Sequence, residues 1–164
     1  MIYVTLGTMF LDFRRLVDAV DDIASISDEQ VVVQLGMSPC RPQHCAWFDF
    51  LPREEVLEIQ RHARVIVGHA GIGTALDAMS VGRPFVIVPR LKRFNEHMND
   101  HQIEIADAIE RRGWGAKILR IEQLPAACEN PPPVPDAYRP NKAPLVGAVR
   151  SMVERVAARG SSRD

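Results

Sequence analysis

The chain has 164 residues, of which 46% are hydrophobic and 25% are charged, enough for one globular domain with a core of its own. Its 20 basic and 21 acidic side chains leave a formal net charge of −1, which argues against a dedicated nucleic-acid binder. No apolar run approaches the roughly 20 residues of a membrane-spanning helix, and we expect no signal peptide. Three cysteines are too few and too odd in number for a disulfide framework, which favours a cytoplasmic protein.

Short β-branched runs alternate with helical patterns through most of the chain. The expected strands are Ile2–Leu6, Gln30–Leu35, Ala46–Phe48, Val65–Val67, Pro84–Val88 and Ala116–Leu119. Helices are expected after Asp12, which is a plausible N-cap, and over Arg53–His62, Thr74–Val81 and Glu96–Arg112. This alternation favours parallel strands joined by right-handed crossovers. We therefore predict a doubly wound, Rossmann-like α/β domain over residues 1–124.

The C-terminal part of the chain has a different composition. Seven prolines fall between Pro125 and Pro144, which predicts an extended strap or linker over residues 125–144. Beyond it, apolar residues at helical spacing predict an amphipathic helix over residues 145–159; they are Leu145, Val149, Met152, Val153 and Val156. This helix either packs back on its own sheet or docks on another protein.

Glycine-rich turns follow three of the predicted strands, at Gly7–Thr8, at Gly36 and along Gly68–Thr74. The carboxyl ends of parallel strands meet at one edge of the sheet, where ligands bind. Glycines there let backbone N–H groups approach an anion, and the helix that begins near Thr74 points its positive end to the same place. The pattern favours a phosphate or diphosphate site over glycines that merely permit tight turns.

Several alternative sites have weaker support. A P-loop lysine is absent, and Leu76 stands where a dinucleotide fingerprint needs its third glycine. His97 and His101 have metal-ligand spacing but lack the H-E-x-x-H pattern, and the loop with Cys40, His44 and Cys45 offers too few ligands. No serine lies in a G-x-S-x-G elbow. We therefore expect no metal, no cofactor and no hydrolase triad.

Two further polar features lie near the glycine turns. Asp77, one turn after Thr74, suits either a sugar diol or an exposed helix position. The run from His97 to Gln102 is rich in groups that both donate and accept, which suits sugar hydroxyls or a solvated first helical turn. Before it, Arg90, Lys92 and Arg93 could assist the bound phosphate charge or face an anionic membrane surface.

The combined motifs resemble the donor-binding C-terminal domain of GT-B glycosyltransferases of family 28. They are His69 to Asp77 (HAGIGTALD), Gly82-Arg83-Pro84, and Asn99 to Ala106 (NDHQIEIA). The opening Val4-Thr5-Leu6-Gly7-Thr8 is similar to that of the short, stand-alone members. Those members include the bacterial PssE-like exopolysaccharide proteins and the soluble subunit of the two-chain UDP-N-acetylglucosamine transferase.

The resemblance implies roles for matching positions. The donor diphosphate would be held by Gly7, Thr8, His69, Gly71, Gly73 and Thr74. Asp77 stands where the family places the ribose-binding acid, usually Glu, and the donor sugar would contact Asn99, His101 and Gln102. Phe50 and Leu51 would lie beside the base. No position can be assigned as the catalytic base.

The resemblance also implies a partner, because a complete GT-B enzyme has two Rossmann-like domains. In the short members a membrane-anchored chain supplies the acceptor half and recruits the soluble subunit to the inner face of the membrane. The expected function is a UDP-sugar hexosyltransferase subunit that glycosylates a lipid-linked sugar in polysaccharide biosynthesis. Alternatives are a non-catalytic accessory subunit that stabilises the membrane chain and, with least support, a free-standing dinucleotide enzyme. An isolated chain could also form a homodimer.

Overall fold

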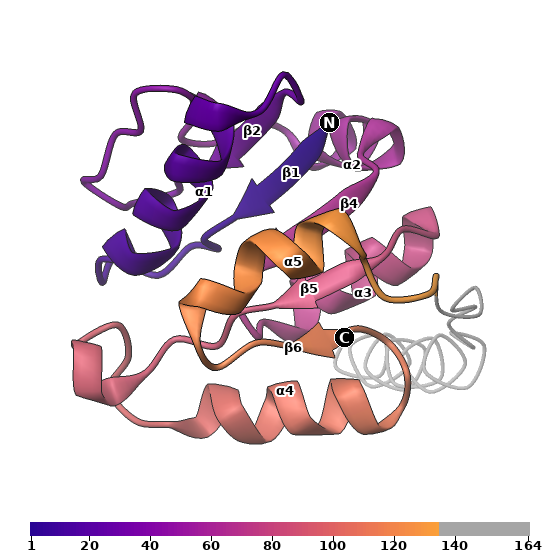
Figure 1. Cartoon of the computed structure of the whole chain (residues 1–164). Helices are drawn as coiled ribbons and strands as arrows, with labels where there is room; N and C mark the ends of the chain where they lie inside the picture. The colour runs from indigo at the N-terminus through magenta and orange to yellow at the C-terminus, as the bar shows by residue number, and fades with distance from the viewer. Residues whose placement is uncertain (135–164) are drawn as a thin grey trace, which may run out of the picture.

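The structure, a computed structural model, describes residues 1–134 and shows a single parallel sheet between two layers of helices (Figure 1). The six strands lie in the order β3-β2-β1-β4-β5-β6 and all pair in parallel. They are β1 (Ile2–Thr5), β2 (Val31–Gln34), β3 (Ala46–Phe48), β4 (Val65–Gly68), β5 (Phe85–Ile87) and β6 (Ala116–Lys117). The predicted doubly wound, Rossmann-like sheet is confirmed.

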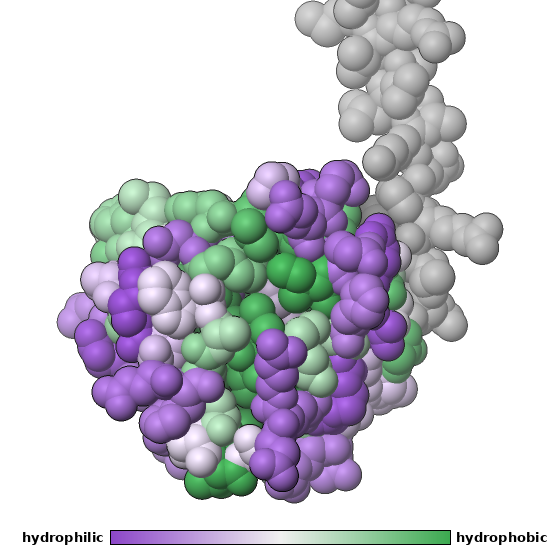
Figure 2. Space-filling model, turned by 90° about the horizontal axis from the view of Figure 1, so that it is seen from above, coloured by the Kyte–Doolittle hydropathy of each residue, from purple (hydrophilic) through white to green (hydrophobic). Residues whose placement is uncertain are grey.

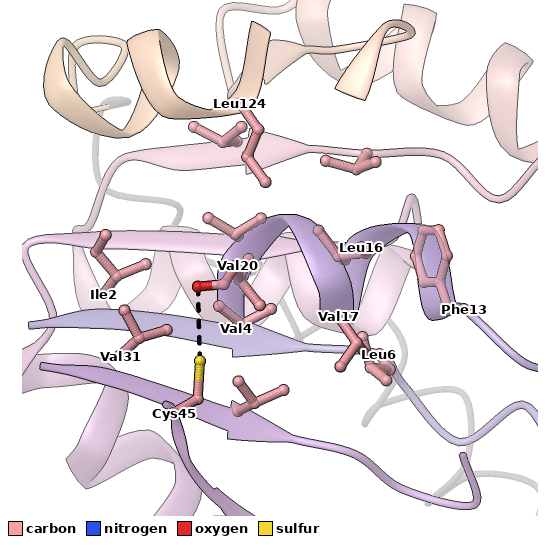
Figure 3. Packing of buried hydrophobic residues seen from close by; sticks show 14 of the residues in the cluster. Ile2, Val4, Leu6, Phe13, Leu16, Val17, Val20, Val31, Cys45 and Leu124 are labelled. Atoms are coloured by element: carbon pink, nitrogen blue, oxygen red, sulfur yellow. Dashed lines mark hydrogen bonds between the residues drawn. The ribbon is translucent and has the colours of Figure 1, made fainter. Parts of the chain in front are cut away.

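Helices cover both faces of this sheet, as the crossover rule requires. The helices are α1 (Arg14–Ile26), α2 (Arg53–His62), α3 (Ile72–Val81), α4 (His101–Arg111) and α5 (Leu124–Glu129), and the 3₁₀ turns are η1 (Lys92–Phe94) and η2 (Ile121–Gln123). On one face, Leu16 and Val20 of α1 and Leu124 of α5 pack over Val4 and the other inward residues of the strands (Figure 3). On the other face, Tyr3 and Ile66 are buried with residues of α2, α3 and α4.

Some large hydrophobic side chains lie on the surface of the protein. A space-filling view of one face shows hydrophobic residues as a band between hydrophilic flanks (Figure 2). Several large exposed hydrophobic residues stand in the loops that follow strands; they are Phe10, Met37, Phe50, Phe94 and Met98. These loops surround the carboxyl edge of the sheet, where the glycine turns lie.

Two helices begin later than the sequence predicts, because the side chains expected at their starts contact distant parts of the chain instead. Asp12 is not an N-cap: α1 begins at Arg14, and Asp12 Oδ1 instead accepts hydrogen bonds from Ser38 Oγ at 3.3 Å and Cys40 Sγ at 2.9 Å. The helix expected from Glu96 begins only at His101, because Glu96 is buried and its carboxylate binds Arg15 and the Leu91 N–H.

The C-terminal prediction is wrong at its start. Helix α5 occupies Leu124–Glu129, where an extended strap was expected. Pro125 lies in the first turn of α5, where a missing backbone N–H breaks no helical hydrogen bond, and Leu124 and Cys128 are buried in the core. The rest of the predicted strap beyond residue 134 and the predicted helix 145–159 lie outside the described residues. Within residues 1–134, no helix is both long and apolar enough to cross a membrane.

Candidate functional site

The loops after β1 and β2 meet backbone to backbone at the carboxyl edge of the sheet. Gly7 and Gly36 both have left-handed backbone conformations, with φ of +74° and +61°. A Cβ atom at position 36 would lie 2.2 Å from the carbonyl oxygen of Gly7, closer than any real contact. Glycine is therefore required at position 36 by conformation and by space together.

The imidazole of His69, directly after β4, fits between two glycines. A Cβ atom at Gly7 would lie 2.4 Å from His69 Cε1, and one at Gly71 would lie 2.3 Å from His69 Nε2. Each glycine thus leaves the space that the ring occupies. Three residues predicted to hold a diphosphate, from two different loops, are brought into direct contact.

Burial keeps this imidazole neutral. Desolvation by burial, followed by the charge of Arg90, lowers the pKa of His69 to about 4. The Thr5 main chain acts in the opposite direction, and the charge of His97 lowers the pKa a little further. Nδ1 is buried and forms no hydrogen bond of ordinary geometry with the residues described. A neutral ring carries one N–H donor and one acceptor, so His69 is suited to a hydrogen bond with a phosphate oxygen.

Helix α3 begins directly beyond this histidine. Its N-cap is Gly71, no side chain caps its first turn, and no acidic residue stands there. The first backbone N–H groups of a helix have no partner within the helix and carry partial positive charge. Gly73 has open space around it, and the methyl group of Thr74 packs close to Gly68. This end of α3 could therefore accept an anion, at the position where the sequence analysis expects one.

A polar network supports the first loop from beneath. The Tyr3 hydroxyl donates to Gln34 Oε1 at 2.8 Å, and Thr5 Oγ1 donates to the same oxygen at 3.1 Å. Thr5 Oγ1 in turn accepts the N–H of Gly7 at 3.3 Å, next to exposed Thr8. Through these contacts Tyr3, Thr5 and Gln34 hold Gly7 in place, and their positions within strands gave no sign of that role.

Asp77 lies one turn along α3 from Thr74 and forms an ion pair with Arg53 at the start of α2. Its side chain is 22% exposed, against 65% for Arg53. The predicted ribose-binding carboxylate is therefore accessible but already has a basic neighbour. The sequence did not indicate Arg53, since the pair joins two helices.

The polar run before α4 divides into two parts. Gln102 is buried, and its Oε1 accepts the backbone N–H of Arg90 at 2.9 Å, which leaves its amide NH₂ for a ligand. Asn99 and His101 are exposed: Asn99 Oδ1 accepts the His101 N–H at 3.1 Å, and His101 Nδ1 lies 3.4 Å from Glu104 Oε2. The three predicted sugar ligands thus share one helix start but differ in exposure.

Phe50 and Leu51 follow β3 on the other side of the glycine turns. Phe50 is 53% exposed, and the tip of its ring lies 3.8 Å from the Cβ position of Gly36. Leu51 is half-buried against the core that contains Tyr3. An exposed aromatic side chain beside the turn is compatible with contact to a flat base.

Arg90 is the main residue that sequence reasoning misplaced, because it is fully buried and faces neither solvent nor membrane. Its guanidinium donates to the carbonyls of Leu6 at 2.9 Å, Leu11 at 2.8 Å, Asp12 at 3.2 Å and Glu96 at 3.2 Å. Burial lowers its pKa to about 10, which still leaves it charged near neutral pH. Arg90 thus fastens the loop after β1 to the loop after β5.

The residues weighed as metal ligands have separate partners. His97 Nδ1 contacts the backbone of Asn99, Cys40 contacts Asp12, and His44 pairs with Asp21. Within residues 1–134, no group of three or more His, Cys, Asp or Glu side chains is placed to hold a metal ion.

The fold matches that of solved glycosyltransferases. The glycotransferase of kitacinnamycin superposes with a TM-score of 0.60 at 19% identity, over 79% of this chain and 34% of that protein. An NMR structure of ALG13 superposes with a TM-score of 0.58 at 18% identity, over 88% of this chain and 93% of that one. These similarities establish a GT-B-like, Rossmann-like fold.

The sequence places the chain within a family. Residues 1–152 match the glycosyltransferase family 28 C-terminal domain, and the chain belongs to that family. The mouse UDP-N-acetylglucosamine transferase subunit ALG13 is 28% identical over 120 residues, which cover 68% of this chain and 10% of that protein. The chain thus spans about a tenth of the length of this curated relative.

Proposed function

We propose that this protein is the donor-binding half of a UDP-sugar-dependent hexosyltransferase. The observation that carries the proposal is the buried, neutral His69 ring between Gly7 and Gly71, at the open N-terminus of α3. Hydrogen-bond donors that converge on one point stabilise the charge that develops on a leaving diphosphate. This chemistry needs neither a metal nor a cofactor.

We propose the remaining contacts for residues that lie at the same edge of the sheet. The diphosphate would lie over Gly7, Thr8, His69, Gly71, Gly73 and Thr74. Asp77 would accept hydrogen bonds from the ribose hydroxyls, with Arg53 holding its carboxylate in place. The donor sugar would meet Asn99, His101 and the free amide of Gln102, and the base would lie beside Phe50 and Leu51.

We further propose that a membrane-anchored partner chain supplies the acceptor half, with a lipid-linked sugar as acceptor in exopolysaccharide or related biosynthesis. The similarity to ALG13, a transferase subunit by its name, supports a partner in general. The protein would then act in the cytoplasm at the inner face of the membrane. A non-catalytic accessory role is the second candidate, since none of residues 1–134 stands out as a catalytic base.

Calorimetric titration of the purified chain tests the donor site directly. We expect UDP to bind, one UDP-sugar to be preferred, and GDP-mannose and NAD to be rejected. His69→Ala and Asp77→Ala should abolish binding, whereas His62→Ala, an exposed histidine at the end of α2, should leave it unchanged. Preferred binding of NAD, or equal binding by wild type and His69→Ala, would contradict the proposal.

A further inference from the structure

A second feature of the carboxyl edge lies outside the donor site, at the turn after β5. Phe94, the last residue of η1, is 49% exposed although its ring is large and apolar. Asn95 closes the turn in a left-handed conformation, with φ of +57°, and its N–H donates to the Lys92 carbonyl at 2.9 Å. The turn thus presents Lys92, Arg93 and Phe94 outward as a unit.

The base of this turn is anchored firmly. Arg15 donates to both carboxylate oxygens of Glu96, at 2.9 and 2.8 Å, and to the Pro89 carbonyl at 3.0 Å. The Glu96 carboxylate also accepts the Leu91 N–H at 3.0 Å. Because both ends of the turn are held this way, the exposure of Phe94 is a property of the fold.

Cationic groups surround the exposed ring. The guanidinium of Arg93 lies 4.8 Å from the ring centroid of Phe94, and that of Arg15 lies 5.2 Å from it. Hollows of about 360 and about 270 Å³ flank the ring. Arg14 and Arg15 line the first, and Arg93 and Arg120 line the second together with Leu119.

Three of these cations have no acidic partner. Within residues 1–134, no carboxylate forms an ion pair with Lys92, Arg93 or Arg120, and all three are exposed. Arg14 pairs with Asp12 at 3.6 Å, and the Glu96 charge is met by Arg15. Asp18 and Glu122 also line the hollows, so among residues 1–134 this surface combines the apolar Phe94 and Leu119 with a modest excess of cations that have no acidic partner.

We propose that this Phe94 patch, made of Lys92, Arg93, Phe94, Leu119 and Arg120, docks on an anionic phospholipid surface. An aromatic ring favours the headgroup level of a bilayer, and neighbouring cations bind lipid phosphates there. The hollow of about 270 Å³ beside Phe94 gives a phosphate a place to lie against the guanidinium groups of Arg93 and Arg120. The inference goes beyond donor binding and does not depend on it, since none of the five residues belongs to the proposed donor site.

Vesicle sedimentation of the full chain tests this surface. The protein should bind vesicles made of equal parts phosphatidylcholine and phosphatidylglycerol, and more weakly those of phosphatidylcholine alone. Reversing both charges with Lys92→Glu and Arg93→Glu should weaken binding to anionic vesicles roughly tenfold or more. Phe94→Ser should weaken it severalfold and leave UDP binding unchanged.

Two control variants test whether vesicle binding depends on the Phe94 patch itself or on any exposed cation or apolar side chain. Arg111→Glu changes an exposed cation at the end of α4, and Ile26→Ser removes an exposed apolar side chain at the end of α1. Both should bind anionic vesicles like the wild type. Failure of the wild type to bind these vesicles, equal binding to neutral vesicles, or unchanged binding by the Phe94 and Lys92/Arg93 variants would each overturn the proposal.

Discussion

At the scale of single residues, Gly7 determines where His69 can lie. Gly7→Ala would place a methyl group 2.4 Å from the imidazole, at a backbone angle that disfavours any side chain. We expect the variant to lose about 1–3 kcal/mol of unfolding free energy and to bind UDP at least roughly tenfold more weakly. Chemical denaturation and calorimetry measure the two effects.

Gly113→Ala provides the control for that substitution. Its backbone is also left-handed, with φ of +68°, but nothing lies within 4 Å of its Cβ position. It should therefore lose about 1 kcal/mol from backbone strain and keep its affinity for UDP. Equal loss of affinity in both variants would show that Gly7 acts through backbone strain alone.

The buried His69 should also make stability depend on pH. Its pKa of about 4 lies below the value near 6.5 of an unfolded chain, so the folded protein binds fewer protons between these values. The contribution of the neutral ring is present above about pH 6.5 and is lost as the pH falls toward 4, up to about 3 kcal/mol. Urea unfolding at the two pH values should show a smaller loss for His69→Gln than for wild type. If the wild type and His69→Gln lose equal amounts of unfolding free energy, the acid sensitivity arises from groups other than His69.

At the scale of elements, Arg90 joins two loops whose ends carry proposed donor contacts. Arg90→Met would leave buried carbonyls in both loops without a donor, for a loss of about 3 kcal/mol or more of unfolding free energy. The exposed Arg93→Met should change stability by only about 0.5 kcal/mol. Thermal unfolding distinguishes the two; a stable Arg90→Met chain would mean that the loops hold without this contact.

Local patterns predicted the elements well and their ends poorly. Strand positions followed from short β-branched runs, and Arg53–His62 was predicted with the bounds that the structure shows. The start of α4 was misplaced because Glu96 is bound by Arg15, 81 positions earlier in the chain, a contact that no local pattern reveals. Similarly, α5 was missed because the many prolines of residues 125–144 were taken to exclude a helix. Pro125 alone falls within α5, in the first turn, where a proline is tolerated.

The site was predictable to the extent that its residues stand in strand-end loops. Glycines and His69 were found by position, since parallel strands bring their carboxyl ends together. The partners Arg53, Gln34 and Arg90 were not, because each acts across elements far apart in the chain. Their roles depend on tertiary packing, which the spacing of residues along the sequence does not reveal.

At the scale of the whole molecule, we expect the proposed donor-binding half to transfer sugar only together with the proposed partner chain. In a reconstituted pair, Gly73→Asp would place a carboxylate at the open start of α3, where the diphosphate should lie, and transfer should fall at least roughly a hundredfold. A radiolabelled-sugar transfer assay measures this. An accessory subunit predicts the opposite outcome, in which the membrane chain keeps its turnover although this pocket is destroyed.

The close approach of Gly36 to Gly7 couples position 36 to His69, although the two residues are not in direct contact. Because a side chain at 36 would collide with the Gly7 carbonyl, the loop after β1 would have to shift, and the His69 ring that rests against Gly7 would shift with it. Substitutions at these three sites should therefore be strongly non-additive, so that a second change costs little once the first has been made. Gly36 therefore affects the position of the His69 ring without touching it, because the effect passes through the backbone of Gly7.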